Sequence, residues 1–322
     1  MLADELERNL ICRVGREVPL APLSTLGVGG IAEYFLEPSC ADDFQTLFSM
    51  RAEKGFPLYI LGGGSNTVFA DGLIPGVFLS TREWKDSFWS EPEAGTVTVE
   101  CQTGHPLASL VNEAVRRGLG GLEFSVGIPG TVGGAIAGNA GAGGQSVGAL
   151  LKELETVEPD GALKRWERGE FSCAYRSFPL AKERHRLFLS CKIVLHCASE
   201  ESIEAELERF RSARSIQPRG ERSAGCSFRN PDGAGKSAGQ LLDQCGCKGM
   251  TAGDAVVSDR HANFILNRGH AGGADVVSLI KACQERVFAR TGIRLVPEVR
   301  FLGFEQEVSV GTVGEKRGPC ES

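Results

Sequence analysis

The feature that most limits how this chain can fold is a segment with ten glycines between positions 121 and 148. Isoleucine, valine and alanine stand between these glycines, so the segment is too apolar and too irregular for a flexible linker. Glycine lets a backbone approach other groups closely because it has no side chain. We therefore interpret the segment as a built loop that holds a ligand. It accounts for part of the glycine excess, which is 42 of 322 residues against a usual share of about 7%.

A second glycine-rich turn lies at residues 62–66, between apolar runs at residues 58–61 and 67–70. This order predicts a strand, a tight turn and a second strand. The turns at 62–66 and 127–134 can direct backbone N–H groups at a pyrophosphate, and Ser65, Asn66 and Thr131 add neutral donors. Neither turn matches a Walker A motif or the GxGxxG spacing of a Rossmann turn. Each turn alone is also compatible with a tight turn that binds nothing.

Hydrophobic periodicity divides the remaining chain into strands and helices. The pattern predicts strands at residues 96–100 and 187–195, and helices at residues 106–117, 203–214 and 276–291. Gly118 is expected to end the first of these helices. Residues 294–301 are expected to form an edge strand, because Pro297 cannot donate to a central ladder. The mixture indicates layers of the α+β class, and residues 304–322, which lack a period, are expected to be a disordered tail.

Charge and cysteine content disfavour several classes of partner. A net charge of −6 and an isoelectric point near 5.6 argue against binding to nucleic acid or to an anionic membrane. The first residues lack the apolar core of a signal peptide, and no run approaches the ~18 apolar residues of a membrane span, so a cytoplasmic protein is expected. Eleven cysteines without CxxC pairs and five dispersed histidines predict neither a disulfide framework nor a metal site. No feature points to an obligate protein partner.

Seven segments, read in order, carry a specific resemblance. They are TLGVGG from Thr25, LGGGSNTVFADG from Leu61, GLEFSVGIPGTVGGAIAGNAGA from Gly121, YRSF from Tyr175, SAGCSFRNP from Ser223, AGDAVVSDRHANFILNRG from Ala252 and PEVRFLG from Pro297. Together they resemble the UDP-N-acetylenolpyruvoylglucosamine reductases, the MurB family, over residues 25 to 303. Each segment alone would mislead, whereas the fixed order of all seven is highly specific.

The resemblance implies a fold and a cofactor. Residues 1–80 and 81–200 would form the two parts of an FAD-binding fold of the vanillyl-alcohol-oxidase (PCMH) type, and residues 201–303 an α+β domain that binds the substrate. FAD would be bound non-covalently, with NADPH as the reductant. The cofactor would contact Leu61, Gly62, Gly63, Gly64, Ser65, Asn66, Gly127, Pro129, Gly130, Thr131, Gly133, Gly134, Asn139, Ala140 and Gly141.

The resemblance also implies the reaction, which is reduction of UDP-N-acetylenolpyruvoylglucosamine to UDP-N-acetylmuramate. A hydride reaches the terminal carbon of the enolpyruvyl group, and the carbon beside the carboxylate must then gain a proton. Arg176 would bind the carboxylate, Cys226 would donate the proton and Glu298 would orient the substrate. The family usually has serine at position 226, but a thiol, with an ordinary pKa of ~8.5, remains a competent acid. Ser227 is a second candidate for this role.

The remaining substrate contacts are less well defined by the sequence. An interval of 50 residues between Arg176 and Cys226 is short, and indicates the branch of the family without an additional substrate-covering loop. The candidates to contact the substrate are Asn230, Arg229, His261 and Asn263, although His261 is equally compatible with a structural role. Candidates for the uridine diphosphate are Arg214, Arg219 and Arg222.

Two other functions compete with this interpretation. A flavin oxidase of a small hydroxy acid or alcohol would have the same fold, since fold alone does not separate the two chemistries. A catalytically inactive nucleotide-binding protein would keep the glycine turns and have no need of the reactive side chains. The presence of Arg176, Glu298 and a protonatable residue at position 226 favours the reductase over both.

Overall fold

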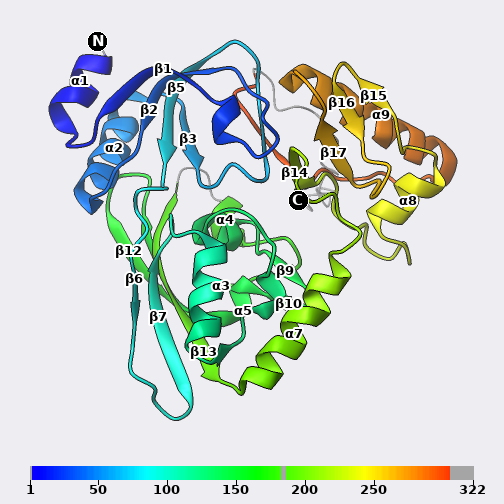
Figure 1. Ribbon diagram of the computed structural model, residues 1–322. Coiled ribbons are helices and arrows are strands. Elements are labelled where there is room, and N and C mark those ends of the chain that lie inside the picture. The colour runs from blue at the N-terminus through cyan, green and yellow to red at the C-terminus, as the bar shows by residue number, and fades with distance from the viewer. Residues whose placement is uncertain (1, 183–185, 305–322) are drawn as a thin grey trace, which may run out of the picture. The chain divides into compact units, whose positions relative to one another are not determined.

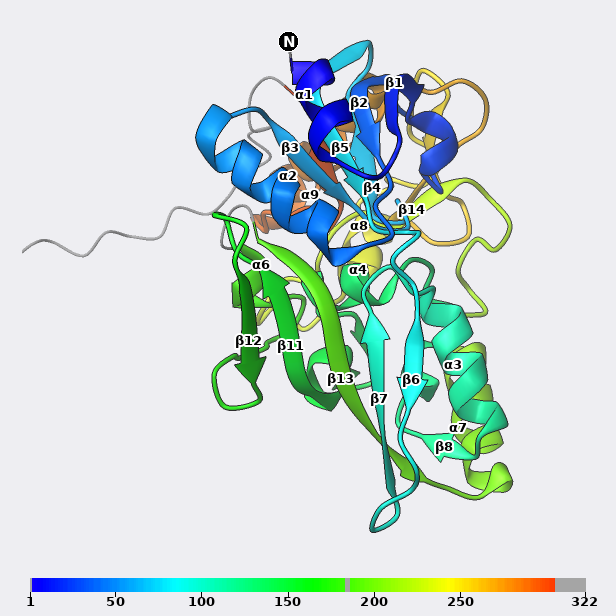
Figure 2. The same ribbon diagram turned by 90° about the vertical axis from the view of Figure 1, so that its left-hand side faces the viewer.

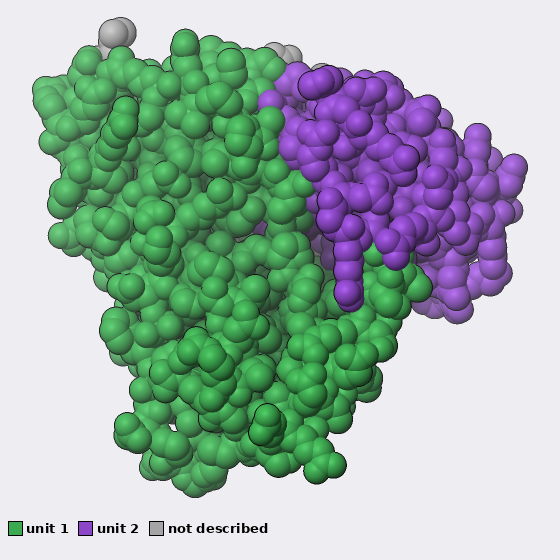
Figure 3. Space-filling view, in the orientation of Figure 1, with its two compact units in different colours: residues 1–25, 30–65, 72–217 green, residues 26–29, 66–71, 218–322 purple. Residues whose placement is uncertain are grey.

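The structure is a computed structural model that describes residues 2–182 and 186–304. The chain divides into two compact units, which Figure 3 distinguishes by colour. Unit 1 contains residues 1–25, 30–65 and 72–217, and unit 2 contains residues 26–29, 66–71 and 218–322. The finer division expected at residues 80 and 200 stays a prediction. The expected tail lies, apart from Phe304, outside the described residues.

The first part of unit 1 is a four-stranded sheet with two helices (Figure 1). Its strand order is β1-β2-β5-β3, with β1 (Val14–Pro19) antiparallel to β2 (Ile31–Leu36), and with β5 (Leu73–Ser80) parallel to both β2 and β3 (Leu58–Leu61). The helices are α1 (Leu2–Asn9) and α2 (Ala41–Lys54), and a short 3₁₀ turn, η1, spans Ala21–Leu23. The predicted strand before the glycine turn at residues 62–66 is therefore confirmed as β3.

The second part of unit 1 is a six-stranded antiparallel sheet. Its main path is β12 (Leu163–Glu167), β11 (Leu151–Val157), β13 (Leu187–Cys197), β7 (Thr96–Gln102) and β6 (Ser87–Trp89), and β8 (Leu119–Gly120) also pairs with β13. Alternate residues Val97, Val99 and Cys101 of β7 are buried, as expected for a strand with one face on a core. They pack with side chains of α3 (Leu107–Arg116), α4 (Val132–Ala137), α5 (Val147–Leu150) and α7 (Glu200–Ala213).

Helix α2 connects the two sheets of unit 1. Its residues Phe44, Leu47 and Phe48 are fully buried, and each such side chain contributes roughly 1.5–3 kcal/mol to the stability of the fold. They share one core with β2 and β5 of the first sheet and with β11 and β13 of the second, through Leu36, Val77, Leu79, Val157, Leu187 and Leu189. Figure 2 shows α2 crossing in front of the strands of the first sheet. The two parts of unit 1 are therefore one packed body.

Unit 2 is a smaller α+β structure with its own core. A four-stranded antiparallel sheet has the order β14 (Ser223–Cys226), β17 (Phe264–Asn267), β16 (Ala255–Val257) and β15 (Thr251–Ala252). A separate parallel pair joins β18 (Arg300–Leu302) to β4 (Thr67–Phe69). Helix α8 (Ala238–Gln244) begins with a capping box of Ser237 and Gln240, and α9 (Gly273–Thr291) packs its apolar face on the sheet.

The helices and most of the strands that the sequence predicts are confirmed, but two expectations are wrong. Residues 294–301 form a strand only at their end, because Pro297 lacks an N–H and the neighbouring groups bond irregularly: Val296 accepts from the N–H of Arg229, and Glu298 donates to the carbonyl of Ser227. The segment from 121 to 148 is not a single loop. It contains η2 (Glu123–Ser125), α4, α5, and the short strands β9 (Gly141–Ala142) and β10 (Gln145–Ser146).

None of the helices in the described parts of the chain is long and apolar enough to cross a lipid bilayer.

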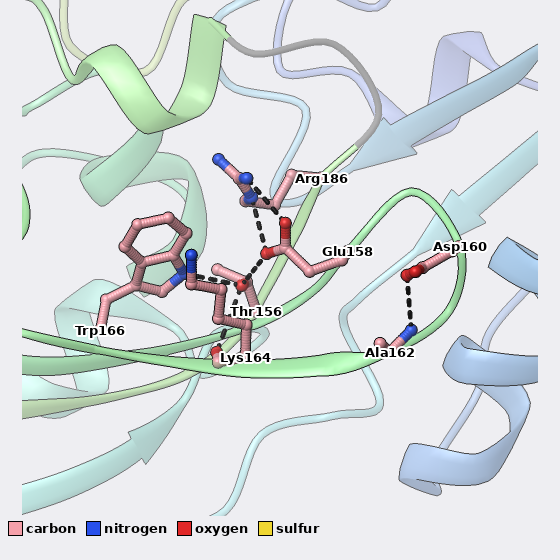
Figure 4. A network of polar contacts seen from close by, with 7 residues as sticks. All are labelled: Thr156, Glu158, Asp160, Ala162, Lys164, Trp166 and Arg186. Atoms are coloured by element: carbon pink, nitrogen blue, oxygen red, sulfur yellow. Dashed lines mark hydrogen bonds and ion pairs between the residues drawn. The ribbon is translucent and has the colours of Figure 1, made fainter.

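A buried ion pair stabilises the hairpin of β11 and β12 (Figure 4). Nε and Nη2 of Arg186 donate to the two carboxylate oxygens of Glu158 at 2.8 and 2.7 Å. Thr156 also donates to this carboxylate, and the ring of Trp166 lies below the guanidinium. Burial alone would raise the pKa of Glu158, but the hydrogen bonds from Arg186 and Thr156 hold that pKa below its ordinary value of 4.5. The charged form of Glu158 is therefore built into the folded state.

Replacement of Arg186 by glutamine is expected to lower the free energy of unfolding by about 3 kcal/mol at pH 7, because it leaves a mostly buried carboxylate without its cation. Urea unfolding of both proteins across pH measures the difference. A depressed folded-state pKa contributes stability above the unfolded value and loses it as pH falls through the folded value, so the difference should shrink below about pH 4.5. Arg165→Gln is the control, since Arg165 is 61% exposed and a surface pair contributes little. An equally small effect at both positions would contradict the prediction.

Candidate active site

The two glycine turns that the sequence singles out meet each other in unit 1. A methyl group added at Gly63 would lie 2.5 Å from the Cα atom of Gly130, and one at Gly62 would lie 2.5 Å from Oγ1 of Thr131. The Oγ of Ser65 donates to the carbonyl of Pro129 at 3.0 Å. Glycine is therefore required here for a close approach of two backbones, in addition to any approach of a ligand. Two turns that lie 64 residues apart in the sequence are therefore in direct contact.

Arg82, two residues beyond β5, orients the first of these turns. Its Nε donates to the carbonyl of Gly62 at 3.2 Å, and its Nη2 donates to the carbonyls of Gly63 and Leu23 at 3.0 and 2.9 Å. Within residues 2–182 and 186–304, the N–H groups of Gly62, Gly63 and Gly64 donate to no protein acceptor. Arg82 thus binds the carbonyls of the turn, while the N–H groups of the turn are left without an acceptor among the described residues. A run of such N–H groups can bind an anion such as a diphosphate. Sequence reasoning missed Arg82, because no motif surrounds it.

Arg176 lies in unit 1, at the tip of a tight turn. Ala174 and Ser177 exchange backbone hydrogen bonds of 2.9 and 3.0 Å around it. Its φ angle is +49°, a left-handed value that glycine and asparagine ordinarily occupy in such turns. The Nη1 atom donates to the carbonyl of Gly141 at 3.0 Å, and the guanidinium carbon lies 5.4 Å from the ring centroid of Tyr175. The guanidinium is half-buried and has a defined orientation.

Asn139, expected to contact the cofactor, is 3% exposed, and both ends of its side chain bond to the protein. Its Nδ2 donates to the carbonyl of Ala174 at 2.7 Å, and its Oδ1 accepts from the N–H of Gly148 at 3.0 Å. The amide therefore links the end of α4 to the turn that carries Arg176.

Cys226 and Glu298 both lie in unit 2, on neighbouring segments. Cys226 ends β14 and pairs with Phe264 of β17, after an irregularity in the register that follows Ser223. Ser227, the next residue, accepts the N–H of Glu298 through its carbonyl at 2.8 Å and is 3% exposed. The Nδ2 of Asn66 donates to the carbonyl of Glu298 at 3.1 Å. Two of the three catalytic candidates, Cys226 and Glu298, therefore lie on segments that are hydrogen-bonded to each other. The bond between the segments runs from the N–H of Glu298 to the carbonyl of Ser227.

Three of the four substrate-contact candidates make extensive contacts within unit 2. Asn263 is 4% exposed and uses its whole amide on Phe228, accepting from its N–H at 2.9 Å and donating to its carbonyl at 2.8 Å. His261 accepts the N–H of Asn263 through Nδ1 and packs on Phe264, and burial lowers its pKa, which favours the neutral ring. Asn230 accepts the N–H of Ala238 at the start of α8. Their roles toward a substrate stay predictions.

Arg229 differs from these three residues. Its Nε is buried, and among the described residues no acceptor bonds to it. Buried donors in proteins normally have a partner, so this atom makes Arg229 the strongest of the four candidates for a ligand contact. No group of three His, Cys, Asp or Glu side chains in the described part of the chain is placed to hold a metal ion.

Comparison with known proteins identifies both parts of this architecture. Residues 32–167 match the model of an FAD binding domain, and residues 217–302 match the C-terminal domain of UDP-N-acetylenolpyruvoylglucosamine reductase. These matches confirm the expected fold class, which is α+β with a two-part FAD-binding fold of the PCMH type and a C-terminal substrate-binding domain.

Relatives that align over nearly their whole length are named UDP-N-acetylenolpyruvoylglucosamine reductase. The chain is 36% identical over 302 residues to the reductase of Synechococcus elongatus, covering 93% of this chain and 98% of that protein. It is 37% identical over 288 residues to the reductase of Gloeobacter violaceus, covering 89% and 95%. The crystal structure of the MurB reductase from Thermus caldophilus superposes with a TM-score of 0.75 at 33% identity, covering 90% of this chain and 99% of that one. The chain therefore belongs to the UDP-N-acetylenolpyruvoylglucosamine reductase (MurB) family.

Proposed function

We propose that this protein reduces UDP-N-acetylenolpyruvoylglucosamine to UDP-N-acetylmuramate with FAD and NADPH, in the cytosol, as a step of peptidoglycan precursor synthesis. The observation that carries the proposal is the alignment with the Synechococcus elongatus reductase, which spans 98% of that enzyme. The alternatives, an oxidase of a small hydroxy acid and an inactive nucleotide-binding protein, have no comparable support. The small-molecule substrate is a UDP-sugar, as the names of the relatives state.

The glycine turns of unit 1 fit the cofactor. The N–H groups of Gly62, Gly63 and Gly64 donate to no acceptor among the residues that the structure describes, and they supply adjacent donors suited to the diphosphate of FAD. Arg82 binds the carbonyls of Gly62 and Gly63. Residues 127–134, Ala140 and Gly141 of the second glycine segment are proposed to complete the contacts with FAD, whereas the side chain of Asn139 bonds to Ala174 and Gly148. FAD held at these residues would supply the hydride for the reduction, with NADPH as the reductant.

Arg82→Met is expected to weaken FAD binding by about tenfold to a hundredfold. The substitution removes three charge-assisted hydrogen bonds from the carbonyls of Gly62, Gly63 and Leu23, and the turn then loses its fixed orientation. Titration of FAD into flavin-free protein, followed by flavin fluorescence, measures the change. Arg116→Met serves as the control, because Arg116 is 73% exposed on α3 and pairs with Glu113 at the surface. Wild-type affinity in Arg82→Met would show that the arginine does not shape the turn.

The remaining chemistry falls to side chains of this chain. Addition of hydride to the terminal carbon of the enolpyruvyl group moves the electron pair of the double bond to the carbon beside the carboxylate. Arg176 is proposed to bind the carboxylate and to stabilise this developing charge. Cys226 is proposed to donate the proton to that carbon, leaving a thiolate that solvent reprotonates. Glu298 is proposed to orient the substrate.

Separate observation of the two half-reactions tests the function. The purified protein should show the absorbance of oxidised flavin, bleach under anaerobic NADPH, and regain its absorbance when UDP-N-acetylenolpyruvoylglucosamine is added. Mass spectrometry should detect UDP-N-acetylmuramate in an amount equal to the flavin that is re-oxidised. Recovery with oxygen or a hydroxy-acid couple, and not with this substrate, would favour the oxidase. Absence of any flavin would favour the binding protein.

A further inference from the structure

The turn that carries Arg176 is held in a conformation that its own sequence does not favour. A left-handed backbone costs a residue other than glycine or asparagine about 1–2 kcal/mol, and Arg176 adopts one at φ +49°. Such a conformation persists only where surrounding contacts determine it. The mutual hydrogen bonds of Ala174 and Ser177 are one such contact, and they lie within the turn itself. Another contact must connect the turn to the rest of unit 1.

The side chain of Asn139 makes this connection. Its Nδ2 donates to the carbonyl of Ala174 at 2.7 Å, the shorter of its two bonds, and its Oδ1 accepts from Gly148 at 3.0 Å. Asn139 is itself left-handed, with φ +42°, a conformation that asparagine tolerates better than most residues. The amide is 3% exposed, so loss of either bond would leave a polar group buried without a partner.

The segment that contains Asn139 also holds the other end of Arg176. The carbonyl of Gly141, two residues beyond Asn139, accepts from Nη1 of Arg176 at 3.0 Å. The backbone turn and the guanidinium of Arg176 are therefore both anchored on residues 139–141, while α4 and α5 flank this segment in the chain. Movement of Asn139 would change both the position and the direction of the guanidinium.

We propose that Asn139 is a positioning residue, which fixes Arg176 in the orientation that meets the substrate carboxylate. The proposal rests on the proposed function and adds a residue that acts through Arg176. On this proposal, a change of the Asn139 side chain affects the half-reaction that consumes the substrate. If the side chain instead contacted the cofactor, the same change would affect flavin binding.

Asn139→Asp is the sharpest test, because aspartate keeps the size of asparagine, its tolerance of the left-handed backbone and an acceptor for Gly148. It replaces the donor to Ala174 with an oxygen that repels the carbonyl. Flavin content and bleaching by NADPH should stay within about twofold of the wild type. Re-oxidation by UDP-N-acetylenolpyruvoylglucosamine should slow about tenfold to a hundredfold, the equivalent of a lost hydrogen bond to a buried group. Amide hydrogen exchange in a peptide that covers residues 174–177 should accelerate.

A double variant separates an effect through Arg176 from an independent one. If Asn139 acts through Arg176, then Asn139→Asp should add less than about twofold to the loss already caused by Arg176→Gln. Multiplication of the two losses would overturn the proposal, and so would loss of flavin or an unchanged re-oxidation rate in Asn139→Asp.

Asn267→Asp is the matched control. Asn267 is also 4% exposed, and its Nδ2 donates to backbone carbonyls, those of Leu26 and Gly27 at 3.1 Å each. Asn267→Asp, like Asn139→Asp, replaces a buried amide donor to backbone carbonyls, so both variants should lose stability, but in Asn267→Asp the ratio of the two half-reaction rates should be unchanged. If the wild-type protein itself is not re-oxidised by the substrate, the proposed function fails. Hydrogen exchange at residues 174–177 then still decides whether Asn139 holds the turn.

Discussion

Cys226→Ala is expected to slow the substrate-consuming half-reaction by about 10²- to 10⁴-fold, the scale typical of a positioned proton donor. The bleaching of flavin by NADPH should be unchanged, because that step needs no proton donor at this position. Cys226→Ser should keep substantial activity, since a hydroxyl restores a donor of similar size. Stopped-flow absorbance of the flavin, recorded separately with NADPH and with the sugar nucleotide, measures both half-reactions. An equal loss in both would refute the assignment of Cys226 as the acid.

The pH dependence of the same variants tests whether the thiol itself donates. A thiol can donate only while protonated, so the rate of re-oxidation should fall as pH rises through its pKa, which is ~8.5 for an unperturbed cysteine. Cys226→Ser should shift this alkaline limb to higher pH, because an alcohol does not ionise in that range. An identical profile in both proteins would leave Ser227 as the alternative donor. Ser227→Ala distinguishes Cys226 from Ser227 as the donor. Because Ser227 is buried, we expect the Ser227→Ala variant to have the pH profile of the wild type.

Arg176→Gln is expected to lower the rate of re-oxidation by about 10²- to 10³-fold, as removal of one group that stabilises developing negative charge does in other enzymes. Lysine at this position should restore little, because an ammonium group cannot form the two-pronged contact with a carboxylate that a guanidinium forms. Residue 176 has a left-handed backbone, which neither arginine, glutamine nor lysine favours, so the comparison isolates the effect of the side chain. Rapid mixing of reduced enzyme with substrate over a range of concentrations separates binding from the chemical step.

The control for Arg176 is Arg168→Gln. Arg168 is exposed in the same connection between β12 and α6 (Pro179–Lys182). Its guanidinium contacts Phe171, through a 3.4 Å bond to the carbonyl and at 5.5 Å from the ring centroid. Its replacement should leave both half-reactions as they are in the wild type. Comparable losses at positions 168 and 176 would mean that the whole connection, and not the guanidinium of Arg176, determines the rate.

The local elements could be predicted because their signals are local. The apolar spacing of Leu107, Leu110, Val111 and Ala114 reappears as the buried face of α3, and the helix expected at residues 276–291 is α9. The expected strand at residues 294–301 was mostly wrong for the opposite reason. Its composition resembles a strand, but the direction of its backbone groups is set by bonds to Ser227 and Arg229, which lie about 70 residues earlier in the chain.

The candidate site, too, could be predicted only in part from the sequence. Seven motifs in fixed order identify the family. Three of these motifs contain Arg176, Cys226 and Glu298, the residues that we propose carry out the chemistry. The sequence could not show that Arg82 orients the glycine turn, since an arginine that binds carbonyls has no motif. Nor could it separate an asparagine that contacts a ligand from one that holds a backbone.

By itself, then, the sequence determined the family, the α+β class and the residues expected to do the chemistry. Only the tertiary structure decided how those residues are held: Asn139 reaches Ala174 across 35 positions, and Asn66 reaches Glu298 across 232. The physical reason is that an amide donates and accepts equally well toward a ligand or a peptide group. Which partner it finds depends on chain segments that folding brings together, and the spacing of residues along the sequence carries no record of that choice.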